Sequence, residues 1–225
     1  MTITAREIHL TRRPAGRPGP EHFRLVDTPL PPPGPGQVLV RNRYLAMRAV
    51  MRTLMTGTGL PLPSYRPGEV MWGPAIGEVV AGGGPGTPPP GTLVAHRHGW
   101  RDHVLAGASE FGELPDGPDS LAPLVHLAQA DTAYVGLVEA AGLREGDTVF
   151  VSGAAGPVGV MAGQIARLKG AGRVVGSAGS PAKAAWLVGT LGFDAAFDRH
   201  DGPIADRLRE AAPGGVDVCF DNVGG

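Results

Sequence analysis

Apolar and polar residues alternate in short runs through the first half of the chain. The runs Phe23-Arg24-Leu25-Val26 and Gln37-Val38-Leu39-Val40-Arg41-Asn42-Arg43 show this period of two clearly, and a proline- and glycine-rich turn separates them. Further candidate strands are residues 7–10, 75–81, 92–96 and 100–105. Alternation predicts half-buried strands, and several short strands at this spacing predict a small β-barrel over residues 1–126.

The pattern changes at Leu127, where segments of helical spacing begin to alternate with short apolar runs. The helical segments are residues 128–141, 160–169, 180–191 and 203–211. The apolar runs are residues 148–151, 173–176, 195–198 and 216–221. Strands that alternate with helices of this length predict a parallel sheet with right-handed crossovers. We therefore expect residues 127–225 to form a separate domain of the dinucleotide-binding type.

A turn of small residues follows the strand predicted at residues 148–151. Glycines stand at positions 153, 156 and 159, and a helical pattern begins directly after them. Small residues let backbone N–H groups approach a pyrophosphate, and a helix N-terminus adds partial positive charge. The turn therefore predicts a dinucleotide site beyond the carboxyl ends of the strands.

The residues after the second predicted strand indicate which dinucleotide is favoured. Sites that prefer NAD usually carry Asp or Glu there, to hold the ribose hydroxyls. Here the run is Gly176-Ser177-Ala178-Gly179-Ser180, without an acid, and Lys183 and Arg199 follow on the same predicted edge. Small hydroxyls and two cations suit a 2′-phosphate, which favours NADP(H). The alternative is that Lys183 and Arg199 are ordinary surface charges.

Composition and charge narrow the classes of partner. The net charge is −1 and the pI is about 6.7, so nothing suggests a nucleic-acid or membrane-surface partner. The first residues contain no long apolar segment, so we expect no signal peptide and a cytoplasmic protein. Cys219 is the single cysteine, which excludes an internal disulfide and a cysteine-rich zinc site.

His96, His98 and His103 are the one group that resembles a metal site. Histidines two positions apart on a strand share a face and could hold a metal ion. Charged residues alternate with them at positions 97, 101 and 102. A solvated strand and loop is therefore the preferred interpretation, and no metal site is expected.

Several motifs in combination resemble one protein family. In the second half they are Ala154-Ala155-Gly156-Pro157-Val158-Gly159, Gly163-Gln164-Ile165-Ala166-Arg167-Leu168-Lys169-Gly170 and Phe220-Asp221-Asn222-Val223-Gly224-Gly225. In the first half they include Gly36-Gln37-Val38-Leu39-Val40, Gly77-Glu78-Val79-Val80 and Gly99-Trp100-Arg101. With these motifs the chain resembles the zinc-independent medium-chain dehydrogenase/reductases, in the branch of prostaglandin/leukotriene reductases and alkenal double-bond reductases.

The resemblance implies a fold of class α/β plus β. A GroES-like barrel domain at residues 1–126 would precede an NADP-binding Rossmann domain, a doubly wound parallel sheet, at residues 127–225. It also implies an enzyme, a zinc-independent NADP(H)-dependent oxidoreductase. Such an enzyme reduces the C=C bond of α,β-unsaturated ketones or aldehydes, so its partners are small molecules.

The resemblance also implies roles for individual residues. The run Gly156-Pro157-Val158-Gly159 would line the pyrophosphate, and Lys183 would hold the 2′-phosphate. Arg199 stands where the family usually has a tyrosine near the adenosine phosphate. Asn222 would lie near the nicotinamide half and Thr132 near the nicotinamide ring. No catalytic residue or proton donor is assigned.

Two departures from the family pattern change what is expected. The family run Asp-Pro-Tyr-Met-Arg, which lines the substrate cleft, corresponds to Arg48-Ala49-Val50-Met51-Arg52, so the tyrosine hydroxyl is absent. The sequence also stops at Gly225, after the fourth predicted strand of a fold that has six. We therefore expect a C-terminally truncated chain with an open sheet edge, and no homodimer of the family type through that edge.

Two alternatives to double-bond reduction remain. A non-catalytic, nucleotide-binding remnant of such an enzyme would bind NADPH weakly without turnover. A quinone reductase would use the same cofactor, and no feature of the sequence decides between a quinone and an enone or enal substrate.

Overall fold

A computed structural model describes residues 2–57, 59, 61–115 and 122–224. Contacts between Cα atoms divide the chain into two compact units, Met1–Leu127 and Ala128–Gly225. Gly225, the last residue of one motif quoted above, lies outside the described residues. None of the described helices is long and apolar enough to cross a membrane.

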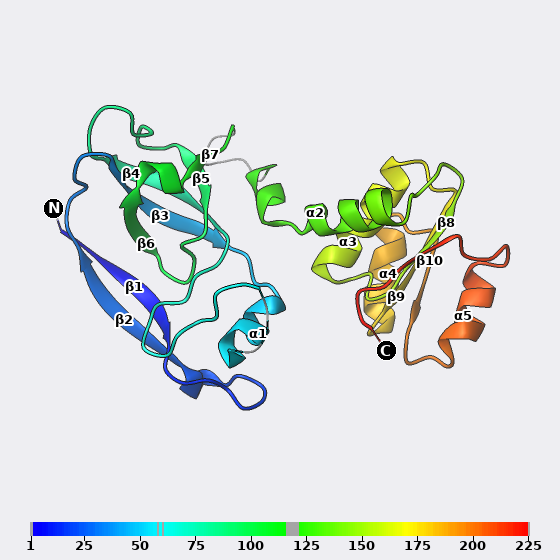
Figure 1. Cartoon of the computed structure of the whole chain (residues 1–225). Coiled ribbons are helices and arrows are strands. Elements are labelled where there is room, and N and C mark those ends of the chain that lie inside the picture. Colours follow the sequence, from blue (N-terminus) through cyan, green and yellow to red (C-terminus); the bar gives the residue numbers. More distant parts are fainter. Residues whose placement is uncertain (1, 58, 60, 116–121, 225) are drawn as a thin grey trace. The chain divides into compact units, whose positions relative to one another are not determined.

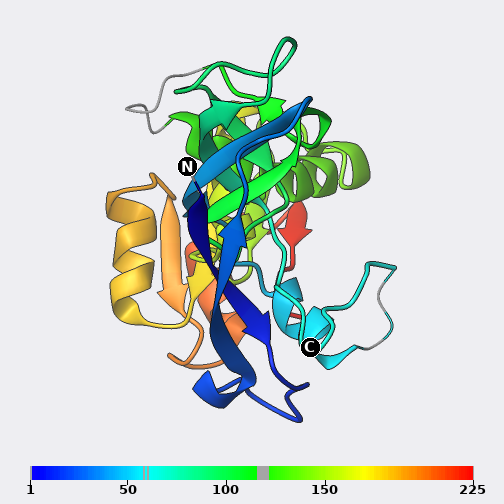
Figure 2. The same ribbon diagram turned by 90° about the vertical axis from the view of Figure 1, so that its left-hand side faces the viewer.

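The first unit is built from antiparallel strands (Figures 1 and 2). Its strands are β1 (Ile3–Leu10), β2 (Phe23–Leu30), β3 (Gln37–Leu45), β4 (Ala75–Gly82), β5 (Leu93–His96), β6 (His103–Gly107) and β7 (Gly112–Glu113). Strands β1 and β2 form a two-stranded ribbon, and the other five form a sheet in the order β6-β3-β4-β5-β7. Isolated bridges between Glu7 and Arg101 and between His9 and Val70 tie the ribbon to the loops of the sheet.

Alternation explains the core of this sheet. Inward-facing residues of β3 to β6 and one phenylalanine form a buried cluster: Val38, Val40, Val79, Val94, Val104 and Phe111. The helical elements of this unit are the short 3-10 turns η1 (Pro20–His22), η2 (Ala108–Glu110) and η3 (Ala122–Leu127), and the α-helix α1 (Val50–Thr56). The six expected strands are therefore confirmed, whereas α1 and the short β7 were not predicted.

The region around the predicted strand 100–105 differs from the expectation. Strand β6 begins at His103, because Trp100 has a φ of 63°, a left-handed backbone conformation that extended strands do not contain. His96 and Arg101 are largely buried, so the interpretation of this stretch as a solvated strand and loop is wrong for these two residues. Strand β5 points His96 into the interior at Phe111, with ring centroids 5.1 Å apart, and Arg101 forms an ion pair with Glu7 at 3.3 Å.

The buried His96 makes the stability of this unit sensitive to acid. Burial is the main cause that lowers the pKa of His96 to about 4, and the neighbouring His98 and Arg101 contribute to the same shift. Because this folded-state pKa lies below the unfolded value of 6.5, stability is retained above pH 6.5 and falls as the pH drops towards 4. Between pH 7 and pH 5 we expect a loss of about 2 kcal/mol from this residue.

Urea unfolding at the two pH values checks this expectation. A His96→Gln variant has no imidazole to protonate at this position. The loss of unfolding free energy between pH 7 and pH 5 should therefore be smaller in the variant by about 2 kcal/mol. An equal pH dependence in the two proteins would contradict the assignment.

The second unit is a parallel sheet with helices on both faces (Figure 1). Its strands are β8 (Thr148–Val151), β9 (Arg173–Ala178), β10 (Ala195–Asp198) and β11 (Val218–Phe220). Its helices are α2 (Ala130–Tyr134), the π-helix η4 (Val135–Ala140), α3 (Pro157–Leu168), α4 (Pro181–Gly189) and α5 (Ile204–Ala211). The sheet order is β10-β9-β8-β11, and each pair is parallel.

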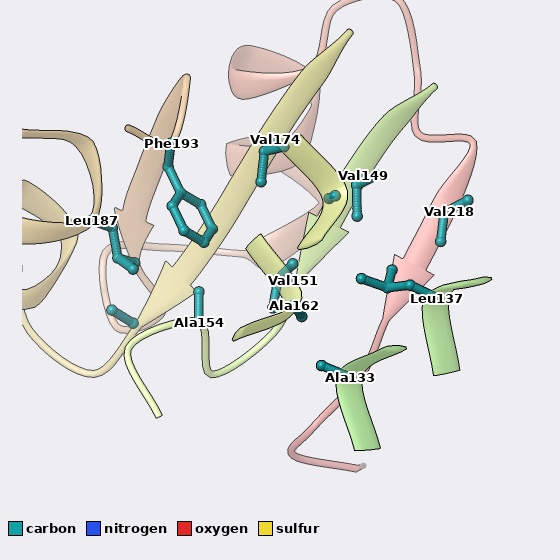
Figure 3. Close-up of a cluster of buried hydrophobic side chains, with 12 residues drawn as sticks. Ala133, Leu137, Val149, Val151, Ala154, Ala162, Val174, Leu187, Phe193 and Val218 are labelled. Carbon is teal, nitrogen blue, oxygen red and sulfur yellow. The ribbon is translucent and has the colours of Figure 1, made fainter. Parts of the chain in front are cut away.

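Successive residues of the strands point to opposite faces of this sheet. On one face Val149, Val151 and Val174 join α2, α3 and α4 in the cluster drawn in Figure 3. On the other face Phe150 and Val175 pack against residues of α5 and Ala212. The predicted strand–helix alternation is confirmed. The segment expected as one helix over residues 128–141 instead widens into a π-helix, where the N–H of Ala141 donates to Gly136 O at 3.0 Å.

Phe193 belongs to the buried cluster on the first of these faces. Its side chain is 2% exposed, and Figure 3 shows it between Leu187 and Val174. A Cβ at Gly163 of α3 would lie only 2.1 Å from its ring, and one at Gly176 of β9 would lie 3.1 Å from it. The two glycines therefore leave the space that this phenylalanine fills.

Candidate dinucleotide site

The sheet of the second unit places one loop where its strand order reverses. Strand β9 lies on one side of β8, and β11 lies on the other. In open α/β sheets, ligands bind in the crevice at such a switch point, beyond the carboxyl ends of the strands. The loop of residues 152–156, which joins β8 to α3, is at this point.

One glycine of this loop takes a backbone conformation that residues with a Cβ rarely adopt. Gly153 has a φ of +56°, and Gly156 takes an extended conformation as the N-cap of α3. A Cβ at Gly159 would lie 2.6 Å from Gly153 O and 2.6 Å from Ala154 Cα. Because both atoms belong to the backbone, the first turn of α3 can pack on the loop only without a side chain at position 159.

The first turn of α3 presents backbone donors to the crevice. Its first residue, Pro157, has no N–H, and the N–H of Val160 donates to Gly156 O at 2.9 Å. The N–H groups of Val158 and Gly159 have no acceptor within the helix, because the first turn leaves them unpaired. These two N–H groups, together with the dipole of a 12-residue helix, can bind an anion such as a pyrophosphate.

The loop after β11 is fixed against this turn by a polar network. The hydroxyl of Ser152 donates to the Asp221 carboxylate and accepts from the N–H of Asn222 at 2.8 Å. The side-chain amide of Asn222 donates to Ser152 O at 3.2 Å. These bonds hold Asn222 beside the glycine turn. Asn222 was expected from the sequence as a cofactor residue, whereas Ser152 and Asp221 were not, although each stands at the end of a predicted strand.

Asp221 remains a carboxylate within this network. The hydrogen bond from Ser152 is the main cause that lowers its pKa below the usual value, and the N–H groups of Val223 and Gly224 add to the effect against a smaller cost of desolvation. An ionised Asp221 therefore holds the turn of residues 221–224 in place at neutral pH.

Small residues also line the end of β9. Ser177 is buried, and its carbonyl accepts from the N–H of Ala154 at 2.8 Å. A Cβ at Gly176 would lie 2.8 Å from the methyl group of Ala154. The glycine turn and the end of β9 are thus in direct contact, and no acidic side chain stands in the run 176–180.

The two cations singled out from the sequence follow this strand end. Ser180 caps α4, and its hydroxyl accepts from the N–H of Lys183 at 3.4 Å. The N–H of Arg199 donates to Ala178 O at 2.9 Å, which places Arg199 next to the end of β9. Both side chains are exposed, and within the described part of the chain neither forms an ion pair.

The structure therefore gathers most of the expected cofactor residues at one edge of the sheet. The following lie at or just after the carboxyl ends of β8 to β11: residues 156–159, Ser177, Lys183, Arg199 and Asn222. Thr132 is different, because it lies on α2, is exposed, and has no side-chain hydrogen bond to this edge within the described residues.

The described residues do not supply a metal centre. No three His, Cys, Asp or Glu side chains are grouped in residues 2–57, 59, 61–115 and 122–224 so that they could hold a metal ion. His98 instead contacts Glu110 at 3.0 Å, and His103 contacts Asp102 at 3.1 Å. These donors do not fit a zinc ion, and no chemistry is assigned to one.

Comparison with known proteins identifies both units. Residues 6–114 match a family model described as the N-terminal domain of oxidoreductase, and residues 157–225 match one described as zinc-binding dehydrogenase. The chain is 38% identical to NADPH-dependent curcumin reductase of Escherichia coli (strain K12), over 96% of this chain and 63% of that protein. It is 37% identical to prostaglandin reductase 1 of Mus musculus, over 99% of this chain and 67% of that protein.

Solved structures give the same result. CurA from Vibrio vulnificus matches with a TM-score of 0.87 and 34% identity, over 99% of this chain and 66% of that one. CurA in complex with NADPH from the same organism matches with a TM-score of 0.87 and 34% identity, over 98% of this chain and 65% of that one. The expected fold is confirmed as a GroES-like antiparallel domain followed by a four-stranded parallel sheet with helices. The chain belongs to the medium-chain dehydrogenase/reductase superfamily, in the branch that contains prostaglandin reductase 1 and curcumin reductase.

Proposed function

We propose that the second unit binds NADP(H) in preference to NAD(H). The N–H groups of Val158 and Gly159 would bind the pyrophosphate, while Gly156 and Pro157 shape the turn around it. The observation that carries the pyrophosphate site is the close packing of α3 on the loop at Gly159, where an added Cβ would lie 2.6 Å from Gly153 O and from Ala154 Cα. The bound NADPH in the similar CurA structure supports it.

Lys183 and Arg199 would bind the 2′-phosphate that distinguishes NADP(H). Both cations lack an acidic partner among the described residues, and the run 176–180 contains two serines, of which Ser177 is buried, and no carboxylate. An acid there would repel the phosphate. Asn222 would lie at the nicotinamide half, and Thr132 near the nicotinamide ring.

The reaction proposed for the protein is reduction of the C=C bond of α,β-unsaturated ketones or aldehydes. Relatives that this chain resembles are named NADPH-dependent curcumin reductase and prostaglandin reductase 1. NADPH, when bound, supplies the hydride for such a reduction. The residues of this chain would bind its phosphates and fix its orientation, and the small-molecule substrate would be an enone or enal.

Fluorescence titration with NADPH and NADH tests the cofactor preference. Replacing Lys183 by glutamine should weaken NADPH binding by about tenfold to a hundredfold, because a hydrogen bond to a charged group contributes about 1.5–3 kcal/mol. Affinity for NADH should stay within about twofold, since that cofactor has no 2′-phosphate.

Lys169→Gln is the matched control for this titration. It removes the same charge directly after the last turn of α3, at the end of the helix remote from the glycine turn. It should leave both affinities unchanged. Equal losses for NADPH and NADH in Lys183→Gln, or no loss, would contradict the assignment of Lys183 to the 2′-phosphate.

Turnover is tested separately with NADPH and 4-hydroxynonenal. Consumption of NADPH clearly above that of a Gly156→Asp variant, whose carboxylate would repel the pyrophosphate, supports the reductase. Binding of NADPH without turnover of any enone or quinone would instead favour a nucleotide-binding protein without this chemistry.

A further inference from the structure

The second unit contains a cavity of about 690 Å³ along one edge of its sheet. Strand β10 is the outermost strand on that side, and α4 and α5 cover opposite faces of the sheet. Figure 2 shows α4 and β10 side by side at this margin. Residues of β10, of both helices and of the loop between β10 and α5 line the cavity. The free edge of β10 therefore borders a groove between two helices.

This edge lacks most of the features with which proteins prevent further strand pairing. Exposed edges are usually protected by lysine, proline, bulges or a covering segment. Residues 195–198 contain neither lysine nor proline, and their register with β9 is regular. The carboxylate of Asp194, just before the strand, is turned towards β9, where it accepts from the N–H of Val174 at 2.7 Å. The edge is therefore open to one further short strand.

The two sides of the groove differ in chemistry. The α4 side is small and apolar, with Pro181, Ala184 and Ala185. The side formed by α5 and the loop before it is polar, with Asp201, Arg207 and Glu210. Successive side chains of a strand point to opposite faces of its sheet. A strand added to β10 would therefore direct alternate side chains to an apolar wall and to a polar wall.

Negative charge predominates on the polar wall. Arg207 is the one arginine or lysine among the described residues that line the cavity, and it lies 3.0 Å from the Glu210 carboxylate and 3.9 Å from that of Asp201. Asp198 also lines the cavity, accepts from the N–H of His200 at 3.0 Å, and forms no ion pair within the described residues. Three carboxylates and one guanidinium leave an excess of negative charge, which favours a basic partner.

We propose that the edge of β10 binds an extended segment of another protein as an additional strand, in which apolar and basic residues alternate. Backbone hydrogen bonds provide the pairing in this mode of recognition, and alternate side chains provide the specificity. The apolar residues contact the alanines of α4, and the basic ones face Asp201 and Glu210. A second copy of this chain would bring the same negative charge to the edge, so repulsion disfavours self-association there. The inference does not rest on the proposed function.

Fluorescence anisotropy with labelled hexapeptides tests this proposal on the whole chain. A peptide of alternating valine and lysine should bind at least about tenfold more tightly than one of alternating valine and glutamate, and salt should reduce the difference. A third peptide, in which proline replaces the central valine of the Val-Lys peptide, keeps the charge but lacks a backbone donor. It should bind at least about tenfold more weakly than the Val-Lys peptide.

Variants of α4 and α5 locate the binding site. Ala185→Arg places a long cation at an exposed position of the apolar wall and should abolish binding of the Val-Lys peptide. Ala182→Arg is the matched control, because Ala182 is an exposed alanine of the same helix outside the cavity lining. It should leave the affinity unchanged. Glu210→Gln should weaken binding by about twofold to fivefold, as expected for loss of one exposed ion pair.

Amide hydrogen exchange distinguishes strand addition from adhesion by charge alone. The Val-Lys peptide should slow exchange in residues 195–198, and Ala185→Arg should remove this protection. Equal affinity for the three peptides, binding without protection of β10, or binding that survives in Ala185→Arg would overturn the proposal. Protection of β10 that increases with protein concentration in the absence of peptide would assign the edge to a second copy, and would overturn it as well.

Discussion

Replacing Gly159 by alanine is expected to reduce the affinity for NADPH by about a hundredfold or more. The new Cβ would lie 2.6 Å from Gly153 O and Ala154 Cα, so the loop and the first turn of α3 must separate. That movement displaces the N–H groups of Val158 and Gly159, and each hydrogen bond to a charged phosphate contributes about 1.5–3 kcal/mol. Overpacking of the backbone should also lower the stability by about 1–3 kcal/mol.

Gly189→Ala is the matched control for this change. Gly189 is the last residue of α4, its φ is not positive, and a Cβ there would meet no atom within 4 Å. This variant should keep its NADPH affinity and gain no more than about 1 kcal/mol of stability. Fluorescence titration and urea unfolding measure both effects. NADPH binding within threefold of the original in folded Gly159→Ala would show that the phosphates do not bind at the N-terminus of α3.

The glycine turn could be predicted from the sequence because its signals are local. An apolar run, small residues and a helical pattern follow one another within residues 148–169, and the structure places β8 and α3 there. The start of α4 was equally clear from Ser180 and Pro181, which cap it as expected. The end of β9 was not clear, since Ser177 and Ala178 continue the strand as small buried residues.

Other features depend on contacts between distant parts of the chain. Ser152 and Asp221 are 69 positions apart and meet only because β8 and β11 are neighbours. His96 resembles a surface histidine among charged residues, yet β5 turns it into the interior. Helix α1 is only seven residues long, so its helical spacing is hard to distinguish from a loop.

A cavity of about 570 Å³ beside helix α1, lined in part by residues 48–52, illustrates the same limit. The sequence showed that the tyrosine of the family motif is absent from the run 48–52, but it did not show what the replacement residues surround. The structure adds Trp100 and the loop after β1, which approach this run from distant segments. A motif can therefore indicate a changed site, while the chemistry of the change depends on tertiary neighbours.

Replacing Phe193 by alanine is expected to destabilise the second unit by about 3–5 kcal/mol, because it empties the centre of a packed core. The residue follows a glycine and has no periodic pattern around it, so the sequence did not indicate that it would be a core residue. In the structure its ring is buried between α3, α4 and β9, where Gly163 and Gly176 leave it room (Figure 3). Amide hydrogen exchange of β8 and β9 measures the loss within this unit.

Gly163→Ala probes the same contact from the opposite side. Its Cβ would lie 2.1 Å from the ring of Phe193, so the single variant should also lose about 1–3 kcal/mol. In the double variant Gly163→Ala/Phe193→Ala the clash disappears and the new methyl group fills part of the cavity. Its loss should therefore be smaller than the sum of the two single losses by at least about 0.5 kcal/mol.

Phe197→Ala serves as the aromatic control for this cycle. Phe197 is half-buried on the opposite face of the sheet, where its ring stacks on Phe150 at 6.1 Å. Phe197→Ala should lower the stability less than Phe193→Ala does. Its loss of stability should also be additive with that of Gly163→Ala. Additive losses for Gly163 and Phe193 would contradict the packing described here. Because Gly163 lies in the helix that follows the glycine turn, coupling at this contact would show that the packing of α3 on the sheet is stabilised through the ring of Phe193.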